Sequence, residues 1–317
     1  YAEATVGTTE SLDYFFEMVR DGERTMELDP FNAAIRYGKP IVSTLNLSPG
    51  TRGSLHLIPS LPSSSTLVYR RDITVYLPPS YQADGDRRYP VLYMQDGQQI
   101  WDSPACAFGG WKMNTAADAL ILAGEIEPVI IVGINNTSRR DDELMGWSAY
   151  HRSDVAKKNR NADPDKILRT AVDFEAYIID TVKPLIDTRY RTKSGREFTG
   201  TGGSSSGAME ALYLAFNNSA VFSKVAALSG GLDYYDDLAS GYLGKGQGLT
   251  IYLDCGDRDL DAELLPATER IRDALLSAGY AEGSTLQYYA ARGMGHNEKA
   301  WAERVPRFLT FLYGTVK

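Results

Sequence analysis

The stretch 203–207, Gly-Ser-Ser-Ser-Gly, separates a strand-like run from a helix-forming run, 208–216. Between a strand and a helix, the pattern Gly-x-Ser-x-Gly allows a tight, strained turn that lifts one serine above the sheet edge. Only Ser205 has a glycine two residues before it and two after it, so Ser204 and Ser206 occupy the variable positions. A bare match of five residues could also be a Gly/Ser-rich loop. The predicted helix before the stretch and the buried strand after it favour the turn, and we predict that Ser205 is a nucleophile.

Apolar runs alternate with helix-forming runs on both sides of this turn. The expected strands are 67–77, 91–94, 129–134, 225–228, 250–253 and 286–289, and the expected helices are 114–122, 174–186, 208–216, 262–278 and 299–311. This alternation predicts an α/β fold with a mostly parallel central sheet and helices on both faces. The ligand site of such a sheet lies at the carboxyl ends of its strands.

The first 65 residues differ from the rest of the chain. Apolar residues from Leu12 to Val19 recur at helical spacing after Thr8 and Thr9, which predicts a short amphipathic helix. Prolines then punctuate an irregular stretch. We expect 1–65 to be an extension that packs on the main domain, either over the active site or only along a sheet edge. Residues 66–317 are then the catalytic domain.

The bulk composition excludes several classes of partner. The chain has 317 residues and a formal charge of -8, so neither nucleic acid nor an anionic membrane is an expected partner. No apolar run reaches the length of a membrane span. Cys106 and Cys255 form neither a disulfide framework nor a metal site, and we expect two free thiols rather than one bridge. Because the chain begins at Tyr1, we expect a processed or trimmed N-terminus. A secreted, periplasmic or cytoplasmic location and the oligomeric state stay open.

A serine nucleophile needs a base, and histidine is the side chain suited to that task near neutral pH. The chain has three histidines: His56 in the extension, His151 in a polar loop far before the turn, and His296 after the last expected strand. In the order Ser, Asp/Glu, His of an α/β-hydrolase, only His296 has both partners before it. We therefore predict that His296 is the base.

The third member of a triad holds the imidazole in the correct tautomer. The stretch after the strand 250–253 offers several carboxylates. Asp254 is expected to end the strand, and Glu263 to begin a solvated helix. Asp259 lies where the loop has cleared the strand and can reach His296. We predict Asp259, with Asp257 as the alternative.

The oxyanion of an acyl-transfer reaction needs two preorganised N–H donors. One is expected to be the backbone of Ser206, directly after the nucleophile and at a helix start. The other is expected to be the backbone of Gln98, in the turn after the strand 91–94, although a plain β-turn is the alternative. Such chemistry requires neither a metal nor an organic cofactor.

Together, several segments resemble the esterase D and enterochelin-esterase-like group of α/β-hydrolases over residues 67–315. The segments are YPVLYMQDGQ at 89–98, VKPLID at 182–187 with YRT at 190–192, the turn at 203–207, and the ending from GHN at 295–297 through Trp301. Through this resemblance, Ser205, Asp259 and His296 match the triad of the group. Two departures are the polar strand 199–202 and Ala208, where the group often has a second glycine.

The resemblance implies a serine carboxylic-ester hydrolase that forms an acyl-enzyme. The group includes siderophore esterases, feruloyl and acetyl esterases of plant polysaccharide, S-formylglutathione hydrolases and mycolyltransferases. The expected substrate is a small-molecule or oligosaccharide-linked ester. A bulky aryl ester, a siderophore ester and a sugar-linked ester all fit this description. An acyltransferase with the same triad, a short-chain carboxylesterase and a non-catalytic binding module are the alternatives.

Substrate contacts are expected from loops at the same end of the sheet. Arg140 lies in a stretch, 139–143, that matches a loop bordering the active site in the group, and it either meets a polar part of the substrate or forms a surface salt bridge. Trp147, Trp101 and the pair Tyr234-Tyr235 lie in or near expected loops, where aromatic rings could stack on an aryl or sugar group. Trp111 and Trp301 belong to the same set. The alternative for each tryptophan is a place in the core.

Overall fold

The computed structural model describes residues 11–20, 23–28, 32, 34–37, 41–46, 50–231 and 248–315. Thr8, Thr9, Tyr234 and Tyr235, which carry two of the predictions above, lie outside these residues. The strands are β1 (Ser11–Tyr14), β2 (Phe16–Arg20), β3 (Glu23–Glu27), β4 (Ala34–Arg36), β5 (Val42–Asn46), β6 (Ser54–Leu61), β7 (Arg71–Leu77), β8 (Val91–Met94), β9 (Ile130–Ile134), β10 (Thr199–Ser204), β11 (Lys224–Leu228), β12 (Thr250–Gly256) and β13 (Leu286–Ala291). The helices are α1 (Met113–Leu122), α2 (Arg140–Met145), α3 (Ala149–Lys158), α4 (Pro164–Tyr177), α5 (Lys183–Arg189), α6 (Ser206–Asn217), α8 (Leu260–Ser277) and α9 (Glu298–Tyr313), with a π-helical turn η3 (Ile178–Val182) and short 3-10 turns that include η1 (Gly97–Gln99).

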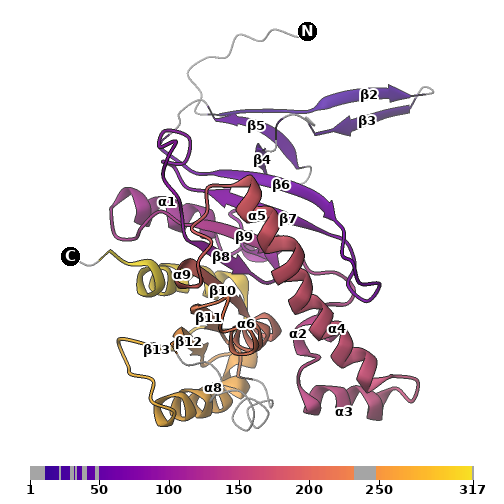
Figure 1. Cartoon of the computed structure of the whole chain (residues 1–317), viewed down its shortest axis with the longest axis vertical. Helices are drawn as coiled ribbons and strands as arrows, with labels where there is room; N and C mark the ends of the chain where they lie inside the picture. The colour runs from indigo at the N-terminus through magenta and orange to yellow at the C-terminus, as the bar shows by residue number, and fades with distance from the viewer. Residues whose placement is uncertain are drawn as a thin grey trace.

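One large sheet organises the described residues (Figure 1), with the strand order β1-β5-β4-β6-β7-β9-β8-β10-β11-β12-β13. From β9 to β13 every neighbouring pair is parallel, while β7 pairs with β9 and with β6 in the antiparallel direction. Parallel strands need crossover connections, and the helices supply them. The predicted mostly parallel α/β sheet is confirmed for this half of the molecule.

The helices cover both faces of the parallel half. Successive residues of β8 point to opposite faces, so Val91 and Tyr93 belong to one apolar cluster while Leu92 and Met94 belong to another. The first cluster packs against α4, α5, α6 and α8, and the second against α1 and α9. Both faces are therefore buried, as expected for the nearly continuous apolar runs of these strands.

The N-terminal strands extend the antiparallel edge of the same sheet. β6 pairs with β7, β4 pairs with β6, and β1 pairs with β5, which in turn pairs with β4. The helix predicted from Leu12 to Val19 is therefore wrong. Phe15 and Phe16 are both about half exposed, at 48% and 47%, so these residues form no single buried helical stripe. Instead β2 pairs with β3 in a separate two-stranded ribbon.

The helices formed by the described residues include none with the length and apolar character needed to cross a membrane.

Candidate active site

Ser205 lies at the junction of β10 and α6 in a backbone conformation that side chains rarely adopt. Its φ is 55° and its ψ is -127°, and its N–H donates to the carbonyl of Leu228 on the neighbouring strand at 2.9 Å. The two glycines are sterically required. A Cβ on Gly203 would come within 2.6 Å of the backbone of Gly207, and a Cβ on Gly207 would come within 3.0 Å of Gln95. The turn predicted from the sequence is present, and Ser205 is its strained residue.

His296 lies between the end of β13 and the start of α9, and its imidazole contacts a buried carboxylate. Nδ1 of His296 lies 2.6 Å from Oδ1 of Asp261 in the first turn of α8. The other oxygen of Asp261 accepts hydrogen bonds from the hydroxyl of Ser229 and the N–H of Gly256, both at 2.8 Å. Burial alone would raise the pKa of Asp261, but the hydrogen bonds from His296, Ser229 and Gly256 outweigh it and hold the pKa below its usual value. Asp261 is therefore held as the ionised partner of His296.

The structure places Asp261, not the predicted acid Asp259, in contact with the imidazole. Asp259 has a φ of 53° and a ψ of -138°, which turns the chain sharply into α8. The helix begins at Leu260 rather than at residue 262, and its first turn brings Asp261 to His296. Asp257, the alternative acid, accepts from the N–H of Gly293 at 2.7 Å, and its other oxygen lies 3.6 Å from the guanidinium of Arg292.

Sequence reasoning missed Asp261 because four aspartates follow one another at 254, 257, 259 and 261. Their order along the chain does not indicate which one reaches across, since that depends on where the chain turns. The only local signal is the preference for acidic side chains in the first turn of a helix. Because the predicted helix began at residue 262 instead of 260, that preference did not distinguish Asp261 from the other nearby acidic residues.

A buried polar network supports His296 and Asp261 from behind. The indole of Trp301 packs edge-to-face against the imidazole, with 5.0 Å between ring centroids, and donates to the hydroxyl of Ser229 at 3.0 Å. Arg304 is fully buried, pairs with Asp254 at 2.8 Å and also donates to Ser229 at 3.2 Å. Burial raises the pKa of Asp254 to about 6, although the nearby guanidinium opposes this rise. Ser229 thus links the histidine's aromatic neighbour, its carboxylate and the buried arginine.

The turn after β8 is rigid and lies close to Ser205. Asp96 has a φ of 54°, and a Cβ on Gly97 would lie 2.3 Å from the backbone of Gly133, so no side chain fits there. The amide oxygen of Gln98 accepts from the N–H of Asn136 at 3.0 Å. The first N–H groups of α6 start without acceptors inside the helix, and Ser206 is its first residue. The backbone N–H group of Gln98 therefore belongs to the fixed turn after β8, and that of Ser206 belongs to the first turn of α6.

The described residues around Ser205 enclose a cavity of about 320 Å³. It brings together four of the residues singled out in the sequence: Ser205, His296, Gln98 and Arg140. Trp111 and Trp301 also line it, and their rings are in contact, with 5.4 Å between centroids. Aromatic and polar side chains thus share the walls.

Arg140 borders the cavity as expected, and it is also held by an ion pair. Its Nε donates to Oδ1 of Asp96 and one terminal nitrogen donates to Oδ2, both at 2.8 Å. The side-chain amide of Asn136 donates to Oδ1 of the same carboxylate at 2.6 Å. The side chain of Arg140 remains 31% exposed. The guanidinium is therefore oriented by Asp96 while part of it faces the cavity.

Trp101 and Trp147 do not line this cavity, contrary to the prediction. Trp101 is fully buried and packs against Gly133 of β9, where a Cβ would come within 2.8 Å of the indole. Trp147 is partly buried and packs against the core cluster that contains Phe174. Both tryptophans are close in sequence to site residues, but their rings take part in packing. Trp111 and Trp301 take the expected aromatic place instead.

The two cysteines are free and buried, as predicted. Cys106 donates to the carbonyl of Gln98 at 3.1 Å, and Cys255 lies on β12 beside Asp261. Burial raises the pKa of the Cys255 thiol to about 12, so it stays protonated.

The family comparison agrees with this geometry. Residues 64–312 match the family model Esterase, described as "Putative esterase". The chain is 23% identical to the uncharacterized protein YbbA of Bacillus subtilis (strain 168) over 252 residues, which are 77% of this chain and 93% of that one. It is 26% identical over 246 residues, 75% of this chain, to an endo-1,4-beta-xylanase/feruloyl esterase of Xylanibacter ruminicola, and the match spans only 29% of that longer protein.

Solved structures of similar fold include two kinds of esterase. A ferulic acid esterase superposes with a TM-score of 0.59 at 20% identity, covering 82% of this chain and 97% of that chain. The ferric enterobactin esterase of Salmonella typhimurium superposes with a TM-score of 0.57 at 18% identity, covering 90% of this chain and 68% of that chain. At these identities the likeness establishes the α/β-hydrolase fold alone. Together with the family match over most of its length, it shows that the chain belongs to the Esterase family and is a carboxylic ester hydrolase.

Proposed function

We propose that this enzyme cleaves esters through a covalent acyl-enzyme on Ser205, with His296 as the base and Asp261 as the acid that orients it. The observation that carries the proposal is the 2.6 Å contact between His296 and Asp261 at a cavity that also holds the strained Ser205. The chain order Ser, Asp, His is that of an α/β-hydrolase. Asp261 replaces Asp259 in the mechanism because it alone of the two contacts the imidazole.

The reaction proceeds in two halves. His296 takes the proton of the Ser205 hydroxyl while the oxygen attacks the ester carbonyl, and the resulting tetrahedral intermediate expels the alcohol, which receives that proton from His296. Water then enters, gives a proton to His296 and attacks the acyl-enzyme. The second intermediate collapses, the acid leaves, and the proton returns to Ser205. Asp261 stays ionised and stabilises the imidazolium formed in each half.

The oxyanion of each intermediate is stabilised by the backbone N–H groups of Ser206 and Gln98. Fixed donors aimed at developing charge lower the activation free energy of such a reaction, by about 3–4 kcal/mol for one donor. The close approach of Gly97 to Gly133 and the hydrogen bond of Cys106 to the Gln98 carbonyl support a turn that does not reorganise during the reaction.

For the substrate, we favour an aromatic acyl group esterified to a sugar. The aromatic wall of Trp111 and Trp301 suits an aryl ring. Asn136 and the guanidinium of Arg140 suit its oxygen substituents. The cavity of about 320 Å³ is at the small end of the range for ligand pockets, about 300–1,000 Å³. It therefore suits one aryl group better than a large macrocyclic siderophore. The feruloyl esterase among the relatives supports the same choice.

The test compares hydrolysis of methyl ferulate, p-nitrophenyl acetate and a catecholate trilactone by the intact chain and by Ser205→Ala. We expect methyl ferulate to have the highest kcat/KM and Ser205→Ala to abolish hydrolysis of every ester. Ser206→Ala is the matched control, because it removes a neighbouring hydroxyl and keeps the backbone N–H, and it should retain most activity. Full activity in Ser205→Ala would contradict the mechanism. A preference for the trilactone would contradict the substrate class. Release of a mixed ester when an alcohol is added would reveal transfer in place of hydrolysis.

A further inference from the structure

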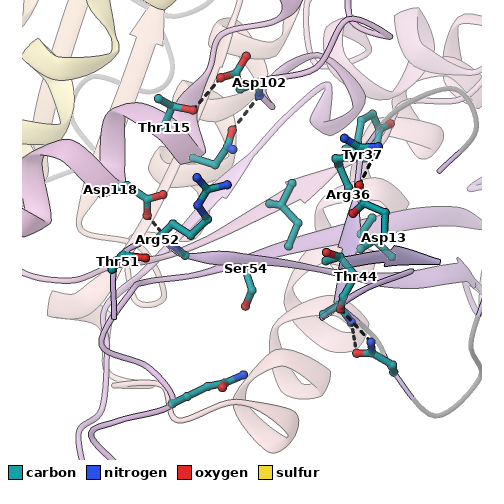
Figure 2. Close-up of a pocket in the computed structure, with 17 residues that line it drawn as sticks. Asp13, Arg36, Tyr37, Thr44, Thr51, Arg52, Ser54, Asp102, Thr115 and Asp118 are labelled. Atoms are coloured by element: carbon teal, nitrogen blue, oxygen red, sulfur yellow. Dashed lines mark hydrogen bonds and ion pairs between the residues drawn. The ribbon is translucent and has the colours of Figure 1, made fainter. Parts of the chain in front are cut away.

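A second cavity, larger than the one at Ser205, lies between the N-terminal strands and the start of α1 (Figure 2). Its volume is about 660 Å³, well within the range of about 300–1,000 Å³ for ligand pockets. The esterase mechanism uses none of its residues. Its walls carry polar side chains from segments far apart in the sequence, which only the folded sheet brings together.

One wall is formed by the stretch before α1 and by α1 itself. Asp102 accepts a hydrogen bond from the hydroxyl of Thr115 at 2.8 Å. Asp118 accepts from the N–H of Gly53 at 2.8 Å, and Figure 2 shows Arg52 beside it. These carboxylates are fixed by their own hydrogen bonds before any ligand arrives, so little ordering entropy is lost when one binds.

The facing wall comes from β1, β4 and β5. Asp13 and Arg36 form an ion pair at 2.7 Å, and Asn32 donates to the carbonyl of Thr44 at 2.9 Å. Figure 2 shows Asp13, Arg36 and Thr44 across the cavity from Asp102 and Asp118, with Tyr37 near Arg36. The side chain of Arg36 is 70% exposed, so it is accessible to a ligand despite its pairing.

The composition of the two walls selects the chemistry of the ligand. Three carboxylates and two guanidiniums leave the cavity slightly negative, so a phosphate or another polyanion gains nothing there. Its hydroxyl, amide and carboxylate groups offer donors and acceptors side by side. Sugar hydroxyls match such a surface because each one both donates and accepts. The ring of Tyr37 and the side chains of Ile35 and Leu55 add apolar surface. We infer that this cavity binds a neutral oligosaccharide.

The segment 99–115 contributes to both cavities. Gln99 and Trp111 line the site cavity, whereas Asp102, Asn114 and Thr115 line the oligosaccharide cavity. A sugar chain held there is bound by the same segment that borders the site of Ser205. This reading rests on the proposed function: the bound sugar is the part of the substrate that carries the aromatic acyl group. Binding of an unesterified oligosaccharide does not depend on it.

The first test is calorimetric titration of the full-length chain with xylopentaose and cellopentaose, and with tetragalacturonate as an anionic probe. We expect one of the neutral oligomers to bind and tetragalacturonate to bind at least 10-fold more weakly. Arg36→Ala and Arg52→Ala should each weaken binding 5-fold or more. Arg169→Ala is the matched control, since it removes an arginine from an exposed ion pair with Asp163 on α4, and it should bind as the unaltered chain does.

Absence of binding by both neutral oligomers, or tighter binding of tetragalacturonate, would overturn the inference. So would equal weakening by Arg169→Ala and Arg36→Ala. The second test compares KM for a feruloylated xylo-oligosaccharide with KM for methyl ferulate. Arg36→Ala should raise KM for the feruloylated xylo-oligosaccharide at least 5-fold. It should leave KM for methyl ferulate and both kcat values unchanged. A parallel rise in both KM values would contradict the inference. Ser205→Ala should lose activity toward both esters and still bind the unesterified oligosaccharide. Its activity tests the proposed mechanism and its oligosaccharide binding tests the inferred cavity, so failure of one is distinguishable from failure of the other.

Discussion

Buried carboxylates in two regions of the molecule differ in the partners they have. Behind the site, Asp261 and Asp254 are matched by His296 and Arg304, with contacts of 2.6 and 2.8 Å. In α6, by contrast, Glu210 is fully buried, and neither of its carboxyl oxygens has a hydrogen-bond partner among the described residues.

The surroundings of Glu210 disfavour its charged form. Burial, together with the charges of Glu175 and Glu143, raises the pKa of Glu210 well above its usual value. Burial also raises the pKa of Glu175 to about 7, against hydrogen bonds from Asn217, Asn218 and Trp147 that favour its charged form. Hydrogen bonds and a cation thus favour the charged form of a buried carboxyl, whereas burial without such partners among the described residues disfavours it at Glu210. Four changes test this distinction.

The largest effect is expected from Asp261→Asn. An amide cannot hold the imidazole in the required tautomer or stabilise its charged form, so kcat should fall about 10³-fold to 10⁴-fold, the range typical of triad acids. Steady-state hydrolysis of methyl ferulate measures this. Asp259→Asn is the matched control and should lose no more than a few fold. A large loss of kcat in Asp259→Asn with a small loss in Asp261→Asn would identify Asp259 as the triad acid.

Arg304→Met should destabilise the fold by about 3–5 kcal/mol, because it leaves Asp254 buried without its cation. Denaturant unfolding at pH 7 measures the free energy. Arg169→Met, which breaks the exposed pair with Asp163 at 3.5 Å, should cost less than about 1 kcal/mol. Similar losses in both variants would show that the buried pair does not hold the region behind His296.

Glu175→Gln should change how stability depends on pH. The carboxyl of Glu175 has a pKa of about 7 in the folded chain and 4.5 as its ordinary value, so the fold binds its proton more tightly than the unfolded chain does. The resulting stabilisation is fully present below pH 4.5 and is lost as the pH rises through 7, a change of roughly 3 kcal/mol. Glutamine does not titrate, so the fall over this window should shrink by that amount. An unchanged fall would mean that Glu175 is not the titrating group.

The smallest effect is expected from Glu210→Met, which should stabilise the fold by about 1 kcal/mol. A buried polar group without partners costs free energy that an apolar side chain of similar size avoids. Glu175→Met is the informative contrast, since it strands the amide donors of Asn217 and Asn218 and should destabilise. Denaturant midpoints at pH 5, below the pKa of about 7 of Glu175, give the comparison. Destabilisation by Glu210→Met would indicate a partner for its carboxyl.

The sequence predicted the parts of the molecule that local chemistry determines. A Cβ at position 203 would lie 2.6 Å from the backbone of Gly207, and one at position 207 would lie 3.0 Å from the side chain of Gln95, so the strained turn around Ser205 can be predicted from five residues. β8 begins and ends where its apolar run does, at Val91 and Met94, because both of its faces are buried. Chain order selected His296, which lines the same cavity as Ser205.

The parts that the sequence did not predict depend on contacts distant along the chain. Asp261 reaches His296 only because Asp259 adopts a positive φ, and no hydropathy pattern encodes that turn. Residues 12–19 show helical spacing, but pairing of β1 with β5 and of β2 with β3 decides their structure. Trp101 fills the space above Gly133, and only the packed sheet distinguishes that place from a cavity wall. The boundary at residue 65 between extension and catalytic domain stays a prediction.

The central claim, that Ser205 forms the covalent intermediate, is tested most directly by trapping. The intact chain is treated with a p-nitrophenyl phosphonate ester, and the modified residue is located by mass spectrometry of its peptides. The mechanism predicts one phosphonyl group per chain on Ser205, no labelling of Ser205→Ala, and slow labelling of Asp261→Asn. Stoichiometric labelling of another residue, or of Ser205→Ala, would contradict it.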